Sequence, residues 1–171
     1  MSLIFRQCTG EDLDALVKLS KQTFITAFEK DNDPDDFKAY IQKAFDPQKL
    51  ASELSDQDTY FYFVEDEGTL VGYFKLNIGQ AQTDVNDADS VEIERIYVVE
   101  GHQGKSIGTL MLQEIIQLAK KMQKTYIWLG VWEHNPKAIR FYQRHHFQKF
   151  GEHPYYIGND KQTDWLLRLD L

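Results

Sequence analysis

Alternation of apolar and polar residues marks the strands of this chain, most clearly in VEIERIYVV over 91–99. Strict alternation places Val91, Ile93, Arg95, Tyr97 and Val99 on one face, and Glu92, Glu94, Ile96 and Val98 on the other. Further strands are predicted over 3–8, 59–66, 69–79, 125–132 and about 163–170, with a hairpin turn at Glu67-Gly68.

Apolar residues at helical spacing follow the strand at 91–99, at positions Ile107, Met111, Ile115, Leu118 and Met122. Other helices are expected to begin at Thr9, Asp33, Asp46 and Asn135, because each is a good N-cap residue. In the last three cases proline follows at the first helical position. The element order predicts an α/β (α+β) fold, one domain over 1–171 around a mixed sheet.

Composition narrows the class of protein. The chain has 171 residues, of which 42% are hydrophobic, enough to build a core. The net charge of −8 argues against a nucleic-acid binder, which would carry a basic stripe. An acidic surface suits cationic substrates, but it also serves solubility alone.

The cysteine content and the hydropathy of the sequence indicate in which cellular compartment to expect the protein. Cys8 is the only cysteine, which excludes an intrachain disulfide and a thiolate metal cluster. No charged-then-apolar leader opens the sequence, and no apolar run reaches the ~18 residues of a membrane span. We therefore expect a cytoplasmic protein with no membrane partner.

The loop GHQGKSIG at 101–108 contains Gly-Lys-Ser, the end of the nucleotide-binding P-loop pattern G-x-x-x-x-G-K-[ST]. The first glycine of that pattern would fall on Val99, inside the strand, and no strand aspartate for magnesium follows. These departures disfavour an NTPase. Backbone N–H groups at a helix start still suit a phosphate, although the loop can also be a plain turn.

Two segments carry a family resemblance. ERIYVVEGHQGKSIGTLML and IWLGVWEHNPKAIRFYQRHHF resemble the GNAT family of N-acetyltransferases. Gln103 to Gly108 match its Q/R-x-x-G-x-G/A signature, and Asn135, Ala138, Phe141 and Tyr142 match its N-x-x-A-x-x-F-Y helix. TFITAF and YIQKAF look like the acceptor-side helices of PaiA-type polyamine acetyltransferases. The resemblance implies a mixed, mostly antiparallel sheet of six to seven strands flanked by helices.

The resemblance also implies acetyl-CoA as the co-substrate. Its pyrophosphate would lie on the loop before the helix, and its pantetheine arm would pair with the strand backbone at 96–98. The implied cofactor-binding residues are Ile96, Tyr97, Val98, Gln103, Gly104, Lys105, Ser106, Ile107, Gly108, Thr109, Asn135, Ala138, Tyr142 and Arg144. The five histidines show no ligand spacing, so we expect no metal.

Two residues depart from the family pattern. Ser106 stands where the family usually has the first motif glycine, and His146 stands where it has the glycine of "GF" at the helix end. Both backbone positions must then adopt angles that a residue with a side chain reaches less readily than glycine.

Acetyl transfer to an amine needs a proton acceptor for the amine and a proton donor for the departing thiolate. The resemblance implies Glu94, or alternatively Glu92, as the base; a relayed water and a purely structural ion pair remain open. It implies Tyr142 as the general acid, and the alternative is that Tyr142 is aromatic core.

Acidic runs flank the expected acceptor side, at Glu29, Asp31, Asp33, Asp35 and Asp36 and at Asp84, Asp87 and Asp89. They favour a polyamine such as spermidine or spermine as acceptor, if they are more than solvated loops. The alternatives are another small amine, an amino-acid or peptide amine, or a non-catalytic acyl-CoA-binding sensor. A homodimer stays open.

Overall fold

The computed structural model describes all of residues 1–171 and contains one seven-stranded sheet with the order β1-β2-β3-β4-β5-β7-β6. Every neighbouring pair is antiparallel except β4 and β5, which run parallel. The strands are β1 (Leu3–Gln7), β2 (Thr59–Asp66), β3 (Thr69–Asn77), β4 (Ser90–Val98), β5 (Tyr126–Trp132), β6 (Gln148–Ile157) and β7 (Asp160–Asp170). The expected mixed, mostly antiparallel sheet is confirmed.

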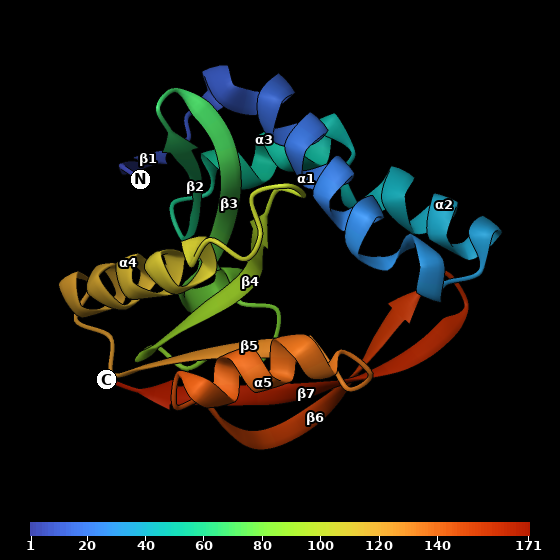
Figure 1. The fold of residues 1–171 in the computed structure, drawn as a ribbon. Coiled ribbons are helices and arrows are strands. Elements are labelled where there is room, and N and C mark those ends of the chain that lie inside the picture. The colour runs from blue at the N-terminus through green and yellow to red at the C-terminus, as the bar shows by residue number, and fades with distance from the viewer.

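Helices cover the sheet on both faces (Figure 1). The α-helices are α1 (Leu13–Phe28), α2 (Pro34–Ala44), α3 (Pro47–Ser55), α4 (Ile107–Lys121) and α5 (Pro136–Arg144), and single 3-10 turns lie at Gly10–Asp12, Glu29–Asp31 and Gly79–Ala81. The expected caps are in place at three helices: the side chains of Asp33, Asp46 and Asn135 each accept a hydrogen bond from a backbone N–H of the first turn.

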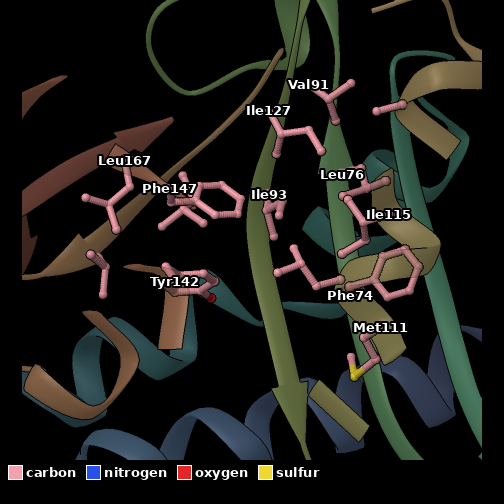
Figure 2. Close-up of a cluster of buried hydrophobic side chains, with 14 of the residues drawn as sticks. Phe74, Leu76, Val91, Ile93, Met111, Ile115, Ile127, Tyr142, Phe147 and Leu167 are labelled. Carbon is pink, nitrogen blue, oxygen red and sulfur yellow. The ribbon is translucent and has the colours of Figure 1, made fainter. Parts of the chain in front are cut away.

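Two apolar clusters fill the layers. One packs α4 and α5 against one face of the sheet, and Figure 2 shows its centre at Phe74, Ile93, Met111 and Ile115. The other packs α1, α2 and α3 against the opposite face and is rich in aromatic rings, including Phe24, Phe37, Phe45, Phe61 and Phe63. The sheet therefore separates the helices that carry the two family motifs from the N-terminal helices.

A β-bulge overturns the predicted alternation in β4. Lys75 pairs with Arg95 but Leu76 pairs with Ile93, so Glu94 is an extra residue that has no paired residue on β3. After the bulge the faces exchange: Ile96 joins Val91 and Ile93 in the α4–α5 cluster. The sequence predicted that Glu92 and Glu94 share a face with Ile96 and Val98. That prediction is wrong, because the bulge lies between the two pairs.

Strand β6 was not predicted. It forms the edge of the sheet beside β7, contains Gly151 and Pro154, and shifts its register between Lys149 and Gly151. Proline and bulges are tolerated at edges because no neighbouring strand needs their N–H groups. They also erase the alternation by which a strand is recognised.

Candidate active site

A cleft of 620 Å³ opens where β4 and β5 separate. The two strands pair only from Ser90 to Ile93 on β4 and from Tyr126 to Leu129 on β5, although both continue beyond these residues. Beyond these residues the two strands have no partner strand on the side of the gap, and side chains from both sheet halves line it. The N-terminal helices and the β6–β7 hairpin close its other walls through Phe24, Phe28, Tyr40 and Tyr155.

Glu92 and Glu94 both line this cleft, and the side-chain amide of Asn77 donates a hydrogen bond to each of them. Its Nδ2 lies 3.0 Å from Oε1 of Glu92 and 3.0 Å from Oε1 of Glu94. Glu94 Oε2 also accepts a 2.8 Å hydrogen bond from Lys75 Nζ, which reaches Glu53 at 2.6 Å. Glu92 instead accepts from the backbone N–H and the hydroxyl of Thr83.

These surroundings shift the pKa values of the two carboxyl groups in opposite directions. Glu92 is only 3% exposed, and burial raises its pKa against the hydrogen bonds from Asn77 and Thr83. Burial acts on Glu94 in the same direction, but the positive charges of Lys75 and Arg95 outweigh it, so the pKa of Glu94 lies below its ordinary value. Glu92 is therefore the stronger proton acceptor of the pair.

Tyr142 lies on α5 with its ring packed edge-on against Phe147 and Phe141. It belongs both to the buried cluster and to the lining of the cleft, with 8% of its surface exposed. Figure 2 shows its hydroxyl pointing away from Phe147 toward β4. Burial raises the pKa of this hydroxyl, so it keeps its proton at neutral pH and can donate it.

The glycine-containing loop leads into α4 without a side-chain cap. The first helical hydrogen bond runs from Leu110 N to Ser106 O, so the N–H groups of Ile107, Gly108 and Thr109 precede the helical ladder. The exposed Gln103 donates a 3.1 Å hydrogen bond from Nε2 to the carbonyl of Val98 and so ties the loop to β4. The arrangement is an anion-binding helix start.

The structure gathers only part of the residues predicted for the site. Glu92, Glu94, Ile96, Tyr97, Asn135, Ala138 and Tyr142 line the cleft. Val98, residues 103–109 and Arg144 lie outside its lining. The loop 103–109 is nevertheless tied to α5, because Gly108 packs against Phe141: a Cβ there would lie 3.5 Å from the phenylalanine ring.

The sequence analysis placed Asp84 beside the acceptor but missed its two neighbours in the cleft lining, His153 and Asp164. His153 Nδ1 lies 3.0 Å from Asp84 Oδ2, and its Nε2 lies 3.6 Å from Asp164 Oδ2. Asp164 and then Asp84 raise the pKa of His153 to about 8, although burial opposes this. These residues come from a loop and from β6 and β7, so no sequence spacing connects them.

Arg95 was also missed, because strict alternation placed it on the face of Val91 and Ile93. It lines the cleft instead. A charged residue on an otherwise apolar face was the available signal for the bulge.

Acidic and histidine side chains form no group of three or more that could hold a metal ion. None of the helices is both long and apolar enough to cross a bilayer.

The model of the acetyltransferase (GNAT) family matches residues 14–147, most of the chain. The chain belongs to the GNAT family. This GNAT chain is 35% identical over 162 residues to an uncharacterized N-acetyltransferase in the pepI 3' region of Lactobacillus delbrueckii subsp. lactis, covering 95% of this chain and 94% of that protein.

Two other relatives have a more specific description. Over 87 residues this GNAT chain is 38% identical to the spermine/spermidine N(1)-acetyltransferase of Bacillus subtilis, covering 50% of this chain and 57% of that protein. Its fold matches the crystal structure of the PaiA N-acetyltransferase of Thermoplasma acidophilum in complex with coenzyme A, with a TM-score of 0.80, 21% identity and full coverage of both chains. At that identity the structural match shows the fold alone.

Proposed function

We propose that this protein transfers an acetyl group from acetyl-CoA to a primary amine held in the cleft between β4 and β5. The family membership gives the reaction class. The cleft itself is the main observation that supports this location of the active site. Glu92, Glu94 and the buried Tyr142 line it where the parallel strands separate. The same family relationship argues against a non-catalytic sensor, which would need neither the proton acceptor nor the donor.

The residues present suit coenzyme A. The uncapped start of α4 offers backbone N–H groups for a pyrophosphate, and Gly104, at φ +79°, lets the loop backbone approach it closely. Around Ile96 and Tyr97, β4 pairs with β3 on one side only, so its backbone groups on the side of the cleft can bind a pantetheine arm. Acetyl-CoA supplies the activated acetyl group as a thioester.

The protein supplies the proton transfers. An ammonium group must lose a proton before it can attack a carbonyl carbon, and Glu92 is the carboxylate best suited to accept it. Burial raises the pKa of Glu92, whereas the positive charges of Lys75 and Arg95 lower the pKa of Glu94. We therefore propose Glu92 as the base in place of the Glu94 favoured by the resemblance. Glu94 then serves to position Lys75, and Tyr142 donates the proton to the departing sulfur.

Polyamines are one candidate acceptor, supported by the description of the Bacillus subtilis relative. The acidic runs support them less than expected, because Asp84 is the only member of those runs that lines the cleft. Asp33 caps α2, and Asp87 accepts a hydrogen bond from the Tyr126 hydroxyl. The choice between a polyamine and another amine depends on the charges within the cleft.

The proposed function is tested by thiol release from acetyl-CoA with polyamines, aminoglycosides, amino acids and peptides as acceptors. Turnover with at least one amine is expected. Tight binding of coenzyme A with no turnover on any amine would instead identify a sensor.

Tyr142→Phe tests the general acid. We expect kcat to fall about 10²-fold, because the thiolate then leaves without a positioned donor. The affinity for coenzyme A, measured by calorimetry, should change little, since the ring that packs against Phe147 is kept. Unchanged kcat would assign Tyr142 to the core alone.

Glu92→Gln and Glu94→Gln form a matched pair for the base. Glu92→Gln should lower kcat/KM by about 10²-fold or more and abolish the acidic limb of its pH profile. Glu94→Gln should lower kcat/KM by less than about tenfold and keep that limb, because it removes only a partner of Lys75. The reverse order of effects would return the role to Glu94.

A further inference from the structure

Arg95 is a cation held inside the cleft. The bulge at Glu94 turns it toward the N-terminal helices, and 11% of its side chain is exposed. Its guanidinium carbon lies 4.6 Å from the ring centroid of Phe45 and 5.7 Å from that of Phe24. The guanidinium is thus placed by aromatic rings at the cleft wall.

Arg95 uses only a small part of its hydrogen-bonding capacity within the protein. Its nearest carboxylate oxygen is Oε2 of Glu94, 3.5 Å from Nε, and that oxygen already accepts from Lys75. Apart from this long ion pair, the guanidinium has no contact with a carboxylate of the protein. The buried hydroxyl of Tyr73, on the neighbouring strand, also has no partner. A guanidinium has five N–H donors, so Arg95 keeps donors that can bind an acceptor entering the cleft.

Two other cationic side chains in or beside the cleft each lie between two carboxylates. Lys75 is shared by Glu53 and Glu94, and His153 lies between Asp84 and Asp164. Arg95 has only one nearby carboxylate, Glu94, which it shares with Lys75. It lies in the part of the cleft lined by Phe24, Tyr40 and Tyr155. Carboxylates line the other part of the same cleft, at Asp84, Glu92 and Asp164. The cleft therefore offers Arg95 as a binding site for an anion, and a separate group of carboxylates as a binding site for an amine.

We propose that Arg95 binds a carboxylate of the acceptor, so that the molecule acetylated is a small amino carboxylate with an apolar or aromatic body. The inference rests on the proposed acetyl transfer for the identity of the reacting group. A guanidinium matches a carboxylate with two parallel hydrogen bonds while its faces stay on aromatic rings. A polyamine has no group to pair with Arg95 and brings further positive charge next to it.

Matched acceptors that differ only in the carboxylate test the proposal in the wild-type protein. Phenylalanine is compared with phenethylamine, and lysine with cadaverine, by thiol release from acetyl-CoA; spermidine is included. We expect kcat/KM to be at least about tenfold higher for the carboxylate-bearing member of a pair, as one or two charge-assisted hydrogen bonds provide. Equal or better use of the decarboxylated amines or of spermidine would overturn the proposal.

Arg95→Gln should remove this preference. We expect its KM for the amino acid to rise at least about tenfold and its kinetics with the decarboxylated amine to stay within about threefold. Lys21→Gln removes one positive charge from an exposed position of α1 and should change neither. An equal loss on both members of a pair would assign Arg95 to packing alone. Because Arg95 is largely buried, Arg95→Lys, which keeps the charge, is measured alongside, and the wild-type comparison decides if neither variant folds.

A binding measurement separates this proposal from the proposed function. Calorimetry compares 3-phenylpropionate with 3-phenylpropan-1-ol, neither of which can be acetylated on nitrogen. We expect the carboxylate to bind the wild-type protein and to bind Arg95→Gln at least about tenfold more weakly, whereas the alcohol binds neither. Such binding without turnover of any amine would refute the acetyltransferase assignment and leave anion binding by Arg95 standing. Equal binding to wild type and Arg95→Gln would refute anion binding by Arg95.

Discussion

Ser106 and His146 both adopt left-handed backbone angles, with φ of +62° and +72°. These are the two positions at which the sequence departs from the family's glycines, and the backbone there keeps the conformation that glycine would favour. At His146 the conformation ends α5: the N–H of Phe147 bonds to Tyr142 O and the N–H of His146 to Gln143 O. At Ser106 it turns the chain into α4. The protein thus tolerates local strain where the loop must present its N–H groups.

The strain at Ser106 predicts the effect of substitution. Ser106→Val should lower the free energy of unfolding by about 1–2 kcal/mol, because a β-branched side chain is disfavoured at positive φ. It should also weaken coenzyme A binding through the displaced loop. Ser106→Gly is the control, and urea denaturation should place it within about 1 kcal/mol of wild type. A Val variant as stable as the Gly variant would show that the left-handed angle is not retained.

At the scale of elements, the bulge in β4 decides which residues form the site. It sends Arg95 and Tyr97 to the face of the N-terminal helices, while Ile93 and Ile96 stay with α4 and α5. Prediction from alternation identified the strand and its acidic residues but assigned the five residues 95–99, after the bulge, to the wrong face. A single unpaired residue reverses every later side chain, and alternation alone does not reveal it.

Gly72 allows β3 to approach β4 just beyond this bulge. A Cβ at Gly72 would lie 2.6 Å from the carbonyl oxygen of Tyr97. Gly72→Ala should therefore lower the free energy of unfolding by about 1–3 kcal/mol, because backbone atoms must shift. It should also lower kcat/KM, since Tyr97 lines the cleft. Gly10→Ala, which has no atom within 4 Å of the added Cβ, is the matched control in the same urea titration.

At the scale of the whole molecule, segments far apart in the sequence close the cleft. The β6–β7 hairpin reaches the N-terminal helices (Figure 1), where Gln162 Nε2 donates a 2.8 Å hydrogen bond to Asn32 Oδ1 and the hydroxyls of Tyr40 and Tyr155 meet. Gly158 at the hairpin turn leaves room for Asp36: a Cβ there would lie 2.6 Å from its carboxylate. The acceptor wall therefore depends on the docking of β6 and β7 against α1 and α2.

The His153 cluster ties this hairpin to the loop before β4 and makes stability depend on pH. The fold raises the pKa of His153 from 6.5 to about 8. Its contribution to the free energy of unfolding is therefore complete below about pH 6.5 and is lost as pH rises through 8. Urea denaturation at pH 6 and 9 should show wild type losing about 1–2 kcal/mol more than His153→Gln over this interval.

The exposed His134, replaced by glutamine, is the control and should follow wild type. An equal loss in wild type and His153→Gln would show that the contacts with Asp84 and Asp164 do not favour the protonated ring.

The sequence by itself determined the elements with strong local signals and the family. Proline after an N-cap residue fixes where three helices begin, because local backbone chemistry encodes a helix start. The loop before α4 and the tyrosine on α5 were singled out by the resemblance of two motifs to the family. Only the tertiary structure decided the face of Arg95, the edge strand β6 and the meeting of Asp84, His153 and Asp164. Those depend on a bulge and on strand pairing between distant segments, whose energies come from contacts that no sequence spacing records.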